Sequence, residues 1–253
     1  CEFLIFDETL ISSLVLADME GVAPVENTGQ VRWFKRPTPG NTYLTSLDPS
    51  MGTGGDYAAI QVFELPSFEQ VAEWHHNQTP MNQQVRILQG INKHIHDTIM
   101  EKDTSATPQI FYSMENNSIG EAALMRVMDI GEENIEGMFL SEPIRKGHRR
   151  KFRRGFNTTA KHKIDACTKF KELIENDKMK INSQLLISEL KDFVASGMSY
   201  NAKPGQHDDL VSACLLMTRM MKVLADFDPK IFEKWTDRTS QITPMPIFGS
   251  FTG

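Results

Sequence analysis

The sequence predicts an α/β fold in which a mixed β-sheet is flanked by helices on both faces. Two observations carry this prediction. Residues 43–75 contain short runs rich in β-formers that are separated by turn residues, as in a strand meander. From residue 80 onwards the apolar residues mostly follow helical spacing, but a short apolar run at 110–114 interrupts the helices. The predicted order is therefore strand meander, helix, strand, helix and then further helices.

The N-terminal part is predicted to be an edge segment followed by the meander. Residues 1–40 mix short apolar runs with proline and glycine, which indicates a connector or an edge hairpin. Three strands are predicted over residues 43–47, 57–65 and 71–75. The first strand ends at Asp48, and the glycines at positions 52, 54 and 55 allow a tight turn into the second.

The rest of the chain is predicted to be mainly helical. Helices are predicted over residues 80–101, 118–128, 159–176 and 185–194, and from residue 210 onwards. Short strands are predicted at 110–114 and 179–181. Ser118 is the predicted N-cap of its helix, because Glu121 stands three residues later and completes a capping box.

The length of 253 residues fits one domain with extensions and allows a substantial core. We expect the main domain to span residues 41–226, between the edge segment 1–40 and a C-terminal helix and tail over 227–253. The chain begins with Cys1 instead of methionine, so we interpret it as a piece of a longer protein.

The composition is ordinary for a globular protein, with 40% hydrophobic and 24% charged residues. The net charge of -6 argues against a chain that is basic throughout, but it allows a local basic groove. The three cysteines form no C-x-x-C pair, which disfavours a structural zinc site and favours a reducing compartment. No apolar run approaches the roughly 20 residues that span a bilayer. The sequence also lacks a P-loop motif.

Carboxylates mark the ends of three predicted elements. Asp48 ends a strand, Glu115 follows a short buried strand, and Asp208 and Asp209 open an apolar helix. Mg²⁺ and Mn²⁺ prefer carboxylate oxygen and water as ligands. If the fold brings these carboxylates together, they could hold two divalent ions, which is the minimum machinery for metal-assisted hydrolysis of a phosphodiester. Asp48 is then the candidate for bridging both ions.

Each carboxylate also has a simpler interpretation. Asp48 could merely start the turn that contains Pro49 and the following glycines. Glu115 could be a loop residue beside a helix cap, and the Asp208–Asp209 pair could interact favourably with a helix N-terminus. Asp56 is expected to shape the glycine turn and to support the metal ligands without binding the metal itself. His207 is a further supporting candidate that could place water or phosphate.

A dense basic run follows the central helices. Seven lysines or arginines stand between positions 145 and 154, and two more lysines extend the patch. They are Arg145, Lys146, Arg149, Arg150, Lys151, Arg153, Arg154, Lys161 and Lys163. We predict that this patch binds DNA phosphates, and the affinity should then fall steeply with salt. A solvated loop or a contact with an acidic partner would account for the run as well.

Taken together and in order, these motifs resemble the nuclease domain of the large terminase subunit of tailed bacteriophages, of the myovirus kind. The matching segments are Leu47-Asp48, Gly54-Gly55-Asp56-Tyr57, Glu115-Asn116-Asn117-Ser118-Ile119-Gly120 and His207-Asp208-Asp209-Leu210-Val211. The resemblance covers roughly residues 1–225, and the basic run is longer than the family pattern leads us to expect.

The resemblance implies a ribonuclease H-like fold and a metal-dependent endonuclease that cuts double-stranded, concatemeric viral DNA during packaging. It places the metal ligands at Asp48, Glu115 and Asp209, with Asp208 as an alternative, and implies two Mg²⁺ or Mn²⁺ ions. The implied partners are double-stranded DNA, an N-terminal packaging ATPase domain that this piece lacks, and the portal and small terminase proteins. The implied location is the cytoplasm of the infected bacterium, outside the mature virion and away from membranes.

Two other functions stay open from the residues alone. A phosphate-handling enzyme of the actin and sugar-kinase type would use the Asp and Gly-Thr residues between Asp48 and Gly55. That interpretation leaves the late His-Asp-Asp helix unexplained, and the C-terminal half has no second glycine-rich phosphate turn. A non-catalytic DNA-binding module, with acids kept for structural reasons, is the third possibility.

Overall fold

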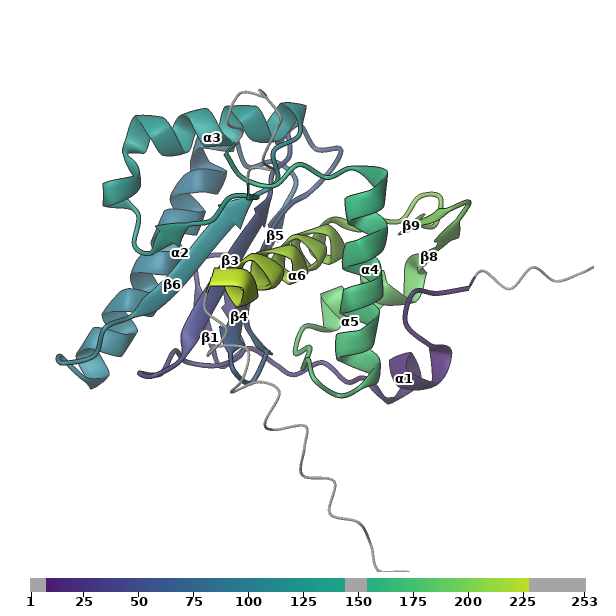
Figure 1. Ribbon diagram of the computed structural model, residues 1–253, viewed down its shortest axis with the longest axis horizontal. Helices are drawn as coiled ribbons and strands as arrows, with labels where there is room; N and C mark the ends of the chain where they lie inside the picture. The colour runs from purple at the N-terminus through teal and green to yellow at the C-terminus, as the bar shows by residue number, and fades with distance from the viewer. Residues whose placement is uncertain (1–7, 144–153, 228–253) are drawn as a thin grey trace, which may run out of the picture.

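The computed structural model describes residues 8–143 and 154–227. A seven-stranded mixed sheet lies between two layers of helices (Figure 1). Helices α2 (Met81–Lys102) and α3 (Ser118–Ile130) cover one face. The other face is covered by three helices, α4 (Ala160–Glu175), α5 (Gln184–Asp192) and α6 (Asp209–Phe227). The predicted fold class is confirmed.

The sheet combines an antiparallel meander with two parallel additions. In chain order its strands are β1 (Glu26–Thr28), β2 (Val31–Trp33), β3 (Thr42–Asp48), β4 (Ala58–Leu65), β5 (Glu69–His76), β6 (Gln109–Met114) and β7 (Met138–Phe139). Their spatial order is β1-β2-β5-β4-β3-β6-β7. Strands β3, β6 and β7 run parallel to one another, whereas all other neighbouring pairs are antiparallel.

The core has two parts because successive strand residues point to opposite faces of the sheet. On β3, Tyr43 and Leu47 pack with helices α2 and α3, whereas Leu44 packs on the side of α4, α5 and α6. Helix α6 crosses the second face and buries Leu210, Cys214 and its methionines, as their helical spacing predicts. The core therefore fixes how α6 lies on the sheet.

Most predicted elements are present, but some local predictions are wrong. The N-cap of α3 is Asn117, whose side chain accepts hydrogen bonds from two backbone N–H groups, and not Ser118. Residues 179–181 form no strand and contribute one isolated parallel bridge, between Lys180 and Glu69. The predicted helix and tail after α6 fall on residues 228–253, outside the described residues.

Several short elements are additions to the sequence prediction. The edge segment contains helix α1 (Ser13–Asp18) before the β1–β2 hairpin, and Trp33 of that hairpin is fully buried. A second, two-stranded sheet forms from β8 (Phe193–Ser196) and β9 (Ser199–Ala202). A single turn of 3₁₀ helix covers Glu132–Asn134. The N-terminal edge segment is thus tied into the main sheet through β2 and β5.

The topology brings three chain positions to one edge of the sheet. Leu47 and Met114 pair at the carboxyl ends of the parallel strands β3 and β6, so the residues that follow them, Asp48 and Glu115, lie beside each other. Strand β4 is antiparallel to β3 and begins at the same edge, directly after Tyr57. In open α/β sheets, such carboxyl edges are where ligands commonly bind.

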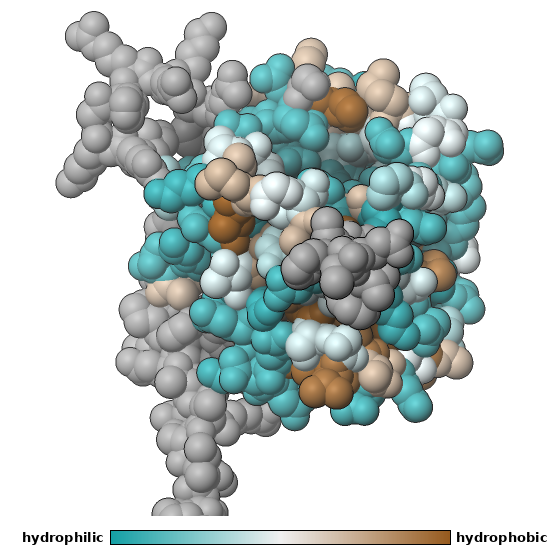
Figure 2. Space-filling view, turned by 90° about the vertical axis from the view of Figure 1, so that its right-hand side faces the viewer, coloured by the Kyte–Doolittle hydropathy of each residue, from teal (hydrophilic) through white to brown (hydrophobic). Residues whose placement is uncertain are grey.

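The surface is mainly hydrophilic on the face of the molecule that Figure 2 presents, and its hydrophobic spots are scattered. Leu14 and Met198 are the most exposed large apolar side chains of residues 8–143 and 154–227. Among the helices of the described residues, none has the length and apolar character required to cross a membrane.

Candidate metal centre

Asp48 and Glu115 form the centre of the site. The backbone N–H of Glu115 donates to the carbonyl of Leu47 at 3.1 Å, which continues the parallel pairing beyond the end of β6. Both carboxylates line a cavity of about 210 Å³ that is closed on its other sides by α4 and α6. Their side chains are within hydrogen-bonding reach of each other. The two carboxylates therefore share one environment.

Glu115 is held in place by the start of helix α3. Asn117 accepts hydrogen bonds from the N–H groups of Ile119 and Gly120 at 3.0 and 2.8 Å, and its own amide donates to Oε2 of Glu115 at 3.0 Å. A Cβ atom on Gly120 would lie 1.8 Å from the carbonyl oxygen of Glu115, so only glycine allows this close approach. One side chain thus caps α3 and orients Glu115.

The Asp208–Asp209 pair opens α6 at the same edge. The N–H groups of Leu210 and Val211 donate to Oε2 of Glu189 on α5, at 2.9 and 3.1 Å. A carboxyl group from another helix therefore satisfies two N–H groups that a helix N-terminus otherwise leaves unpaired. Oδ2 of Asp209 accepts from the N–H of Tyr57 at 3.4 Å. Both aspartates lie close enough to Asp48 for their charges to act on it.

Burial and neighbouring carboxylates raise the pKa of Asp48 and that of Asp209. Burial raises the pKa of Asp48 well above its usual value, and the charges of Glu115, Asp209 and Asp208 raise it further. Burial is also the main reason that the pKa of Asp209 is raised to about 6; Asp208 and Asp56 add to the effect, while the N–H of Tyr57 opposes it. Residues from four separate segments are therefore electrostatically coupled, because like charges disfavour one another's ionisation.

This donor set fits a hard divalent cation. It consists of carboxylate oxygens, which Mg²⁺ and Mn²⁺ prefer, and its mutual repulsion would become attraction around a cation. As they stand, no three His, Cys, Asp or Glu side chains in residues 8–143 and 154–227 are gathered tightly enough to hold a metal ion. Cation binding would therefore require the carboxylates to move closer together around the ion.

The predicted supporting residues lie around the carboxylates. Asp56 is exposed in the turn before β4, and its charge reaches Asp209. His207 is 48% exposed, with Nδ1 3.6 Å from Oδ2 of Asp209. Its ring meets the ring of Tyr57 edge-on, with the centroids 4.9 Å apart.

The basic patch is only partly within the described residues. Arg145, Lys146, Arg149, Arg150, Lys151 and Arg153 lie outside them. Arg154 forms an ion pair with Glu132, and its guanidinium lies 5.6 Å from the ring centroid of Phe139. Lys161 is exposed on α4, whereas Lys163 lines the cavity with Asp48 and Glu115.

Two residues at the site were not anticipated from the sequence. Arg219 lines the same cavity; it pairs with Glu142 and donates to the carbonyl of Asn157 and the hydroxyl of Thr158, both at 3.0 Å. Glu189 supports the start of α6. The sequence signal for Arg219 is its spacing of seven residues from Ser212, which lines the same cavity, because that spacing places both on one face of a helix. Glu189 has no such signal.

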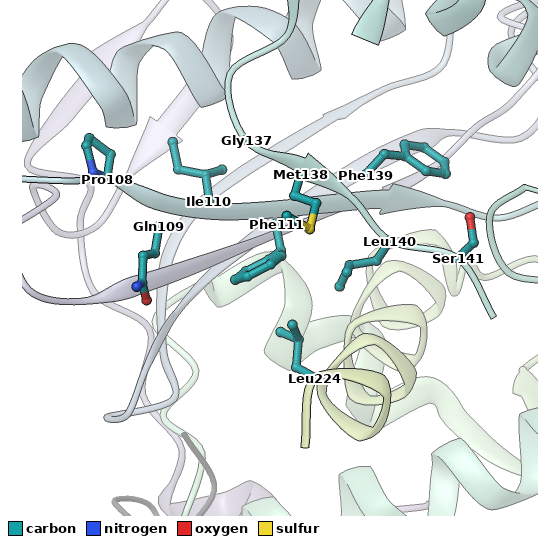
Figure 3. A pocket seen from close by; sticks show the side chains of 10 residues that line it. All are labelled: Pro108, Gln109, Ile110, Phe111, Gly137, Met138, Phe139, Leu140, Ser141 and Leu224. Atoms are coloured by element: carbon teal, nitrogen blue, oxygen red, sulfur yellow. The ribbon is translucent and has the colours of Figure 1, made fainter. Parts of the chain in front are cut away.

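A larger groove, of about 630 Å³, lies elsewhere, where β6 and β7 meet the end of α6 (Figure 3). Its side chains are mostly apolar, with Phe111, Met138 and Leu224 among them, and none of the lining residues is ionisable. This lining offers no carboxylate ligand for a hard cation, in contrast to the smaller acidic cavity.

The mixed sheet with carboxylates at its carboxyl edge defines an α/β domain of the ribonuclease H-like class. A family model described as the terminase RNaseH-like domain matches residues 45–220. The chain belongs to this family.

Solved structures show the same fold at low sequence identity. The large terminase nuclease of thermophilic phage G20c, with bound magnesium, has a TM-score of 0.61 and 16% identity, covering 84% of this chain and 97% of that one. The nuclease domain of the Thermus phage P74-26 large terminase has a TM-score of 0.56 and 16% identity, covering 80% and 92%. The human cytomegalovirus terminase nuclease domain, soaked with manganese and inhibitor-bound, has a TM-score of 0.52 and 12% identity, covering 84% and 94%.

His75 beside the site is expected to make the protein sensitive to acid. Its ring stacks on Tyr57 at 4.1 Å, and burial, aided by the charge of Arg32, lowers its pKa to about 4. The folded state disfavours protonation of His75. The protein therefore keeps its full stability above the unfolded pKa of about 6.5 and loses stability as pH falls toward 4. The loss at pH 5 amounts to about 2 kcal/mol.

The variant His75→Phe keeps a ring on Tyr57 but cannot titrate. Urea unfolding at pH 7 and pH 5 should show that the wild type loses about 2 kcal/mol more stability over this interval than the variant. Equal losses in the two proteins would contradict the prediction.

Proposed function

We propose that this domain is a metal-dependent endonuclease that cuts double-stranded, concatemeric viral DNA during genome packaging. The observation that carries the proposal is the convergence of Asp48, Glu115 and the Asp208–Asp209 pair at one edge of the sheet. Membership of the terminase RNaseH-like domain family supports it. So do the similar terminase nucleases, which have been solved with magnesium bound or soaked with manganese.

In this proposal Asp48, Glu115 and Asp209 hold two divalent ions, with Asp208 as an alternative or additional ligand. Bound ions would supply an activated water and stabilise the leaving oxygen. The chain's own contribution is to place the ligands: Asn117 orients Glu115, Glu189 fixes the start of α6, and the N–H of Tyr57 holds Asp209. Asp56 and His207 support these ligands without binding the ions themselves.

Double-stranded DNA is the proposed substrate, bound through the basic patch from Arg145 to Lys163. We also propose that the domain works with a packaging ATPase domain of the same full-length protein and with portal and small terminase proteins. Its proposed place of action is the cytoplasm of the infected host, without incorporation into the mature virion. These partners and this location follow from the role of a terminase and await their own tests.

Cleavage of supercoiled plasmid tests the proposal. The purified chain should nick and linearise plasmid in Mg²⁺ or Mn²⁺ and be inert in EDTA. Glu115→Gln and Asp209→Asn should each reduce cleavage to background, because each removes a charged ligand. Glu101→Gln, which changes an exposed glutamate on α2, is the matched control and should cleave like the wild type.

The same assay separates the other candidate functions. DNA binding without cleavage would favour a non-catalytic binding module. ATP turnover without cleavage would favour an enzyme of the actin and sugar-kinase type. Full cleavage by Glu115→Gln would contradict the proposed metal centre.

A further inference from the structure

Lys163 lies inside the acidic cavity although it belongs to the basic stretch of the sequence. It stands in the first turns of α4 and lines the cavity together with Asp48 and Glu115. Its Nζ atom donates to Oδ1 of Asn201 at 2.9 Å and lies 3.6 Å from Oδ2 of Asp208. Its side chain is only 21% exposed, and the ammonium group lies 5.5 Å from the ring centroid of Phe193, so it is held at the wall of the cavity.

The ammonium group of Lys163 has donors to spare. A lysine carries three N–H donors. Among the described residues, one of them is directed to Asn201, and the distance to Asp208 is too long for a hydrogen bond. The other cation on the cavity wall, Arg219, is already engaged by Glu142, Asn157 and Thr158. An acceptor that enters the cavity therefore meets the free donors of Lys163.

The charges that line the cavity indicate that this acceptor is a DNA phosphate. A DNA phosphate carries a negative charge, and the carboxylates of Asp48 and Glu115 alone would oppose its approach. The positive charge of Lys163 on the same wall reduces this electrostatic repulsion. Its effect is strongest where little water remains, because screening is weakest there.

We propose that Lys163 is a catalytic residue that donates hydrogen bonds to a non-bridging oxygen of the scissile phosphate. Hydrolysis joins the oxygen of a water to phosphorus and breaks the bond to the leaving sugar oxygen. One proton of that water passes to the leaving oxygen, and the other stays on the phosphate or is released to solvent. Lys163 remains protonated and stabilises the negative charge that builds up on phosphate. This inference rests on the proposed nuclease function.

Lys169 provides a matched control for the loss of one positive charge from α4. It lies six residues later on the same helix, carries the same charge and is exposed. Its Nζ atom donates to Oε2 of Glu172 at 3.0 Å, and it is no part of the basic patch. If Lys163 only attracts DNA, its substitution should weaken binding and leave the cleavage rate at saturating DNA unchanged.

The experiment compares Lys163→Met, Lys163→Arg and Lys169→Met with the wild type. Plasmid cleavage is measured at saturating DNA in Mg²⁺ or Mn²⁺, and DNA affinity by fluorescence anisotropy in EDTA. We expect Lys163→Met to lower the saturated rate by about 10²–10³-fold and to lose only a small amount of affinity. Lys169→Met should retain the wild-type rate. Lys163→Arg should recover part of the rate, because it restores the charge.

The outcomes are distinct. A Lys163→Met protein that cleaves at saturation like Lys169→Met overturns the inference and leaves the nuclease function standing. A wild type that does not cleave overturns both. A thermal melt checks that each variant folds; if Lys163→Met does not, Lys163→Gln takes its place, with the same rate loss expected and an unchanged rate overturning the inference.

Discussion

Asp48→Asn is expected to abolish metal-dependent cleavage and, in EDTA, to make the protein more resistant to heat. Asparagine keeps the size of the side chain but removes its charge. The charged form of Asp48 is disfavoured in the folded state by burial and by Glu115, Asp209 and Asp208. A carboxylate whose pKa is raised on folding costs stability as pH rises above its unfolded pKa of about 3.9. At neutral pH the substitution should therefore stabilise the fold.

The melting temperature in EDTA should therefore rise, because asparagine removes a buried charge that its acidic neighbours oppose. Thermal melts in EDTA and in Mg²⁺, combined with plasmid cleavage, measure both effects. Mg²⁺ should raise the melting temperature of the wild type more than that of Asp48→Asn, because ligand binding stabilises only a fold with an intact site. Glu64→Gln is a useful contrast: Glu64 is buried on β4 but is paired with Lys35. This control should lose stability and retain cleavage.

Two results would contradict this prediction. A lower melting temperature of Asp48→Asn in EDTA would mark Asp48 as a structural residue. Equal stabilisation of both proteins by Mg²⁺ would place the metal elsewhere.

Glu189→Ala is expected to destabilise the protein and to impair cleavage together. Oε2 of Glu189 accepts from the buried N–H groups of Leu210 and Val211. Leaving both groups without a partner should cost about 2–4 kcal/mol in the free energy of unfolding. The start of α6 would also lose its anchor, and Asp209 would shift with it. Urea unfolding and plasmid cleavage measure these two losses.

Glu189→Gln is the matched variant for this prediction. Burial is the main reason that the pKa of Glu189 is raised to about 9, so its carboxyl group is neutral at pH 7. Glutamine is also neutral and keeps an acceptor oxygen for the two N–H groups. It should therefore lose less than about 1 kcal/mol and retain most cleavage. Stability of Glu189→Ala equal to that of Glu189→Gln would show that the two hydrogen bonds do not anchor α6.

Strong local patterns made most of the fold predictable. The long helix α2 and strands β3 to β6 have regular spacing of apolar residues, and this spacing depends only on neighbours along the chain. The β8–β9 hairpin was missed because its strands are four residues each and carry no strong alternation. The cap of α3 was misassigned because Asn117 and Ser118 are both good N-cap residues. Asn117 is favoured as the cap by its hydrogen bond to Glu115, and this bond is made in the folded structure.

The sequence by itself determined the types of most elements and the placing of Asp48, Glu115 and Asp209 at their ends. Only the tertiary structure decided that β3 and β6 lie side by side, which sets Asp48 next to Glu115. It also decided the roles of Glu189 and Arg219, whose partners are 21 and 77 residues away along the chain. The physical reason is that helix and strand periodicity is local, whereas the faces that meet are chosen by packing of the whole core.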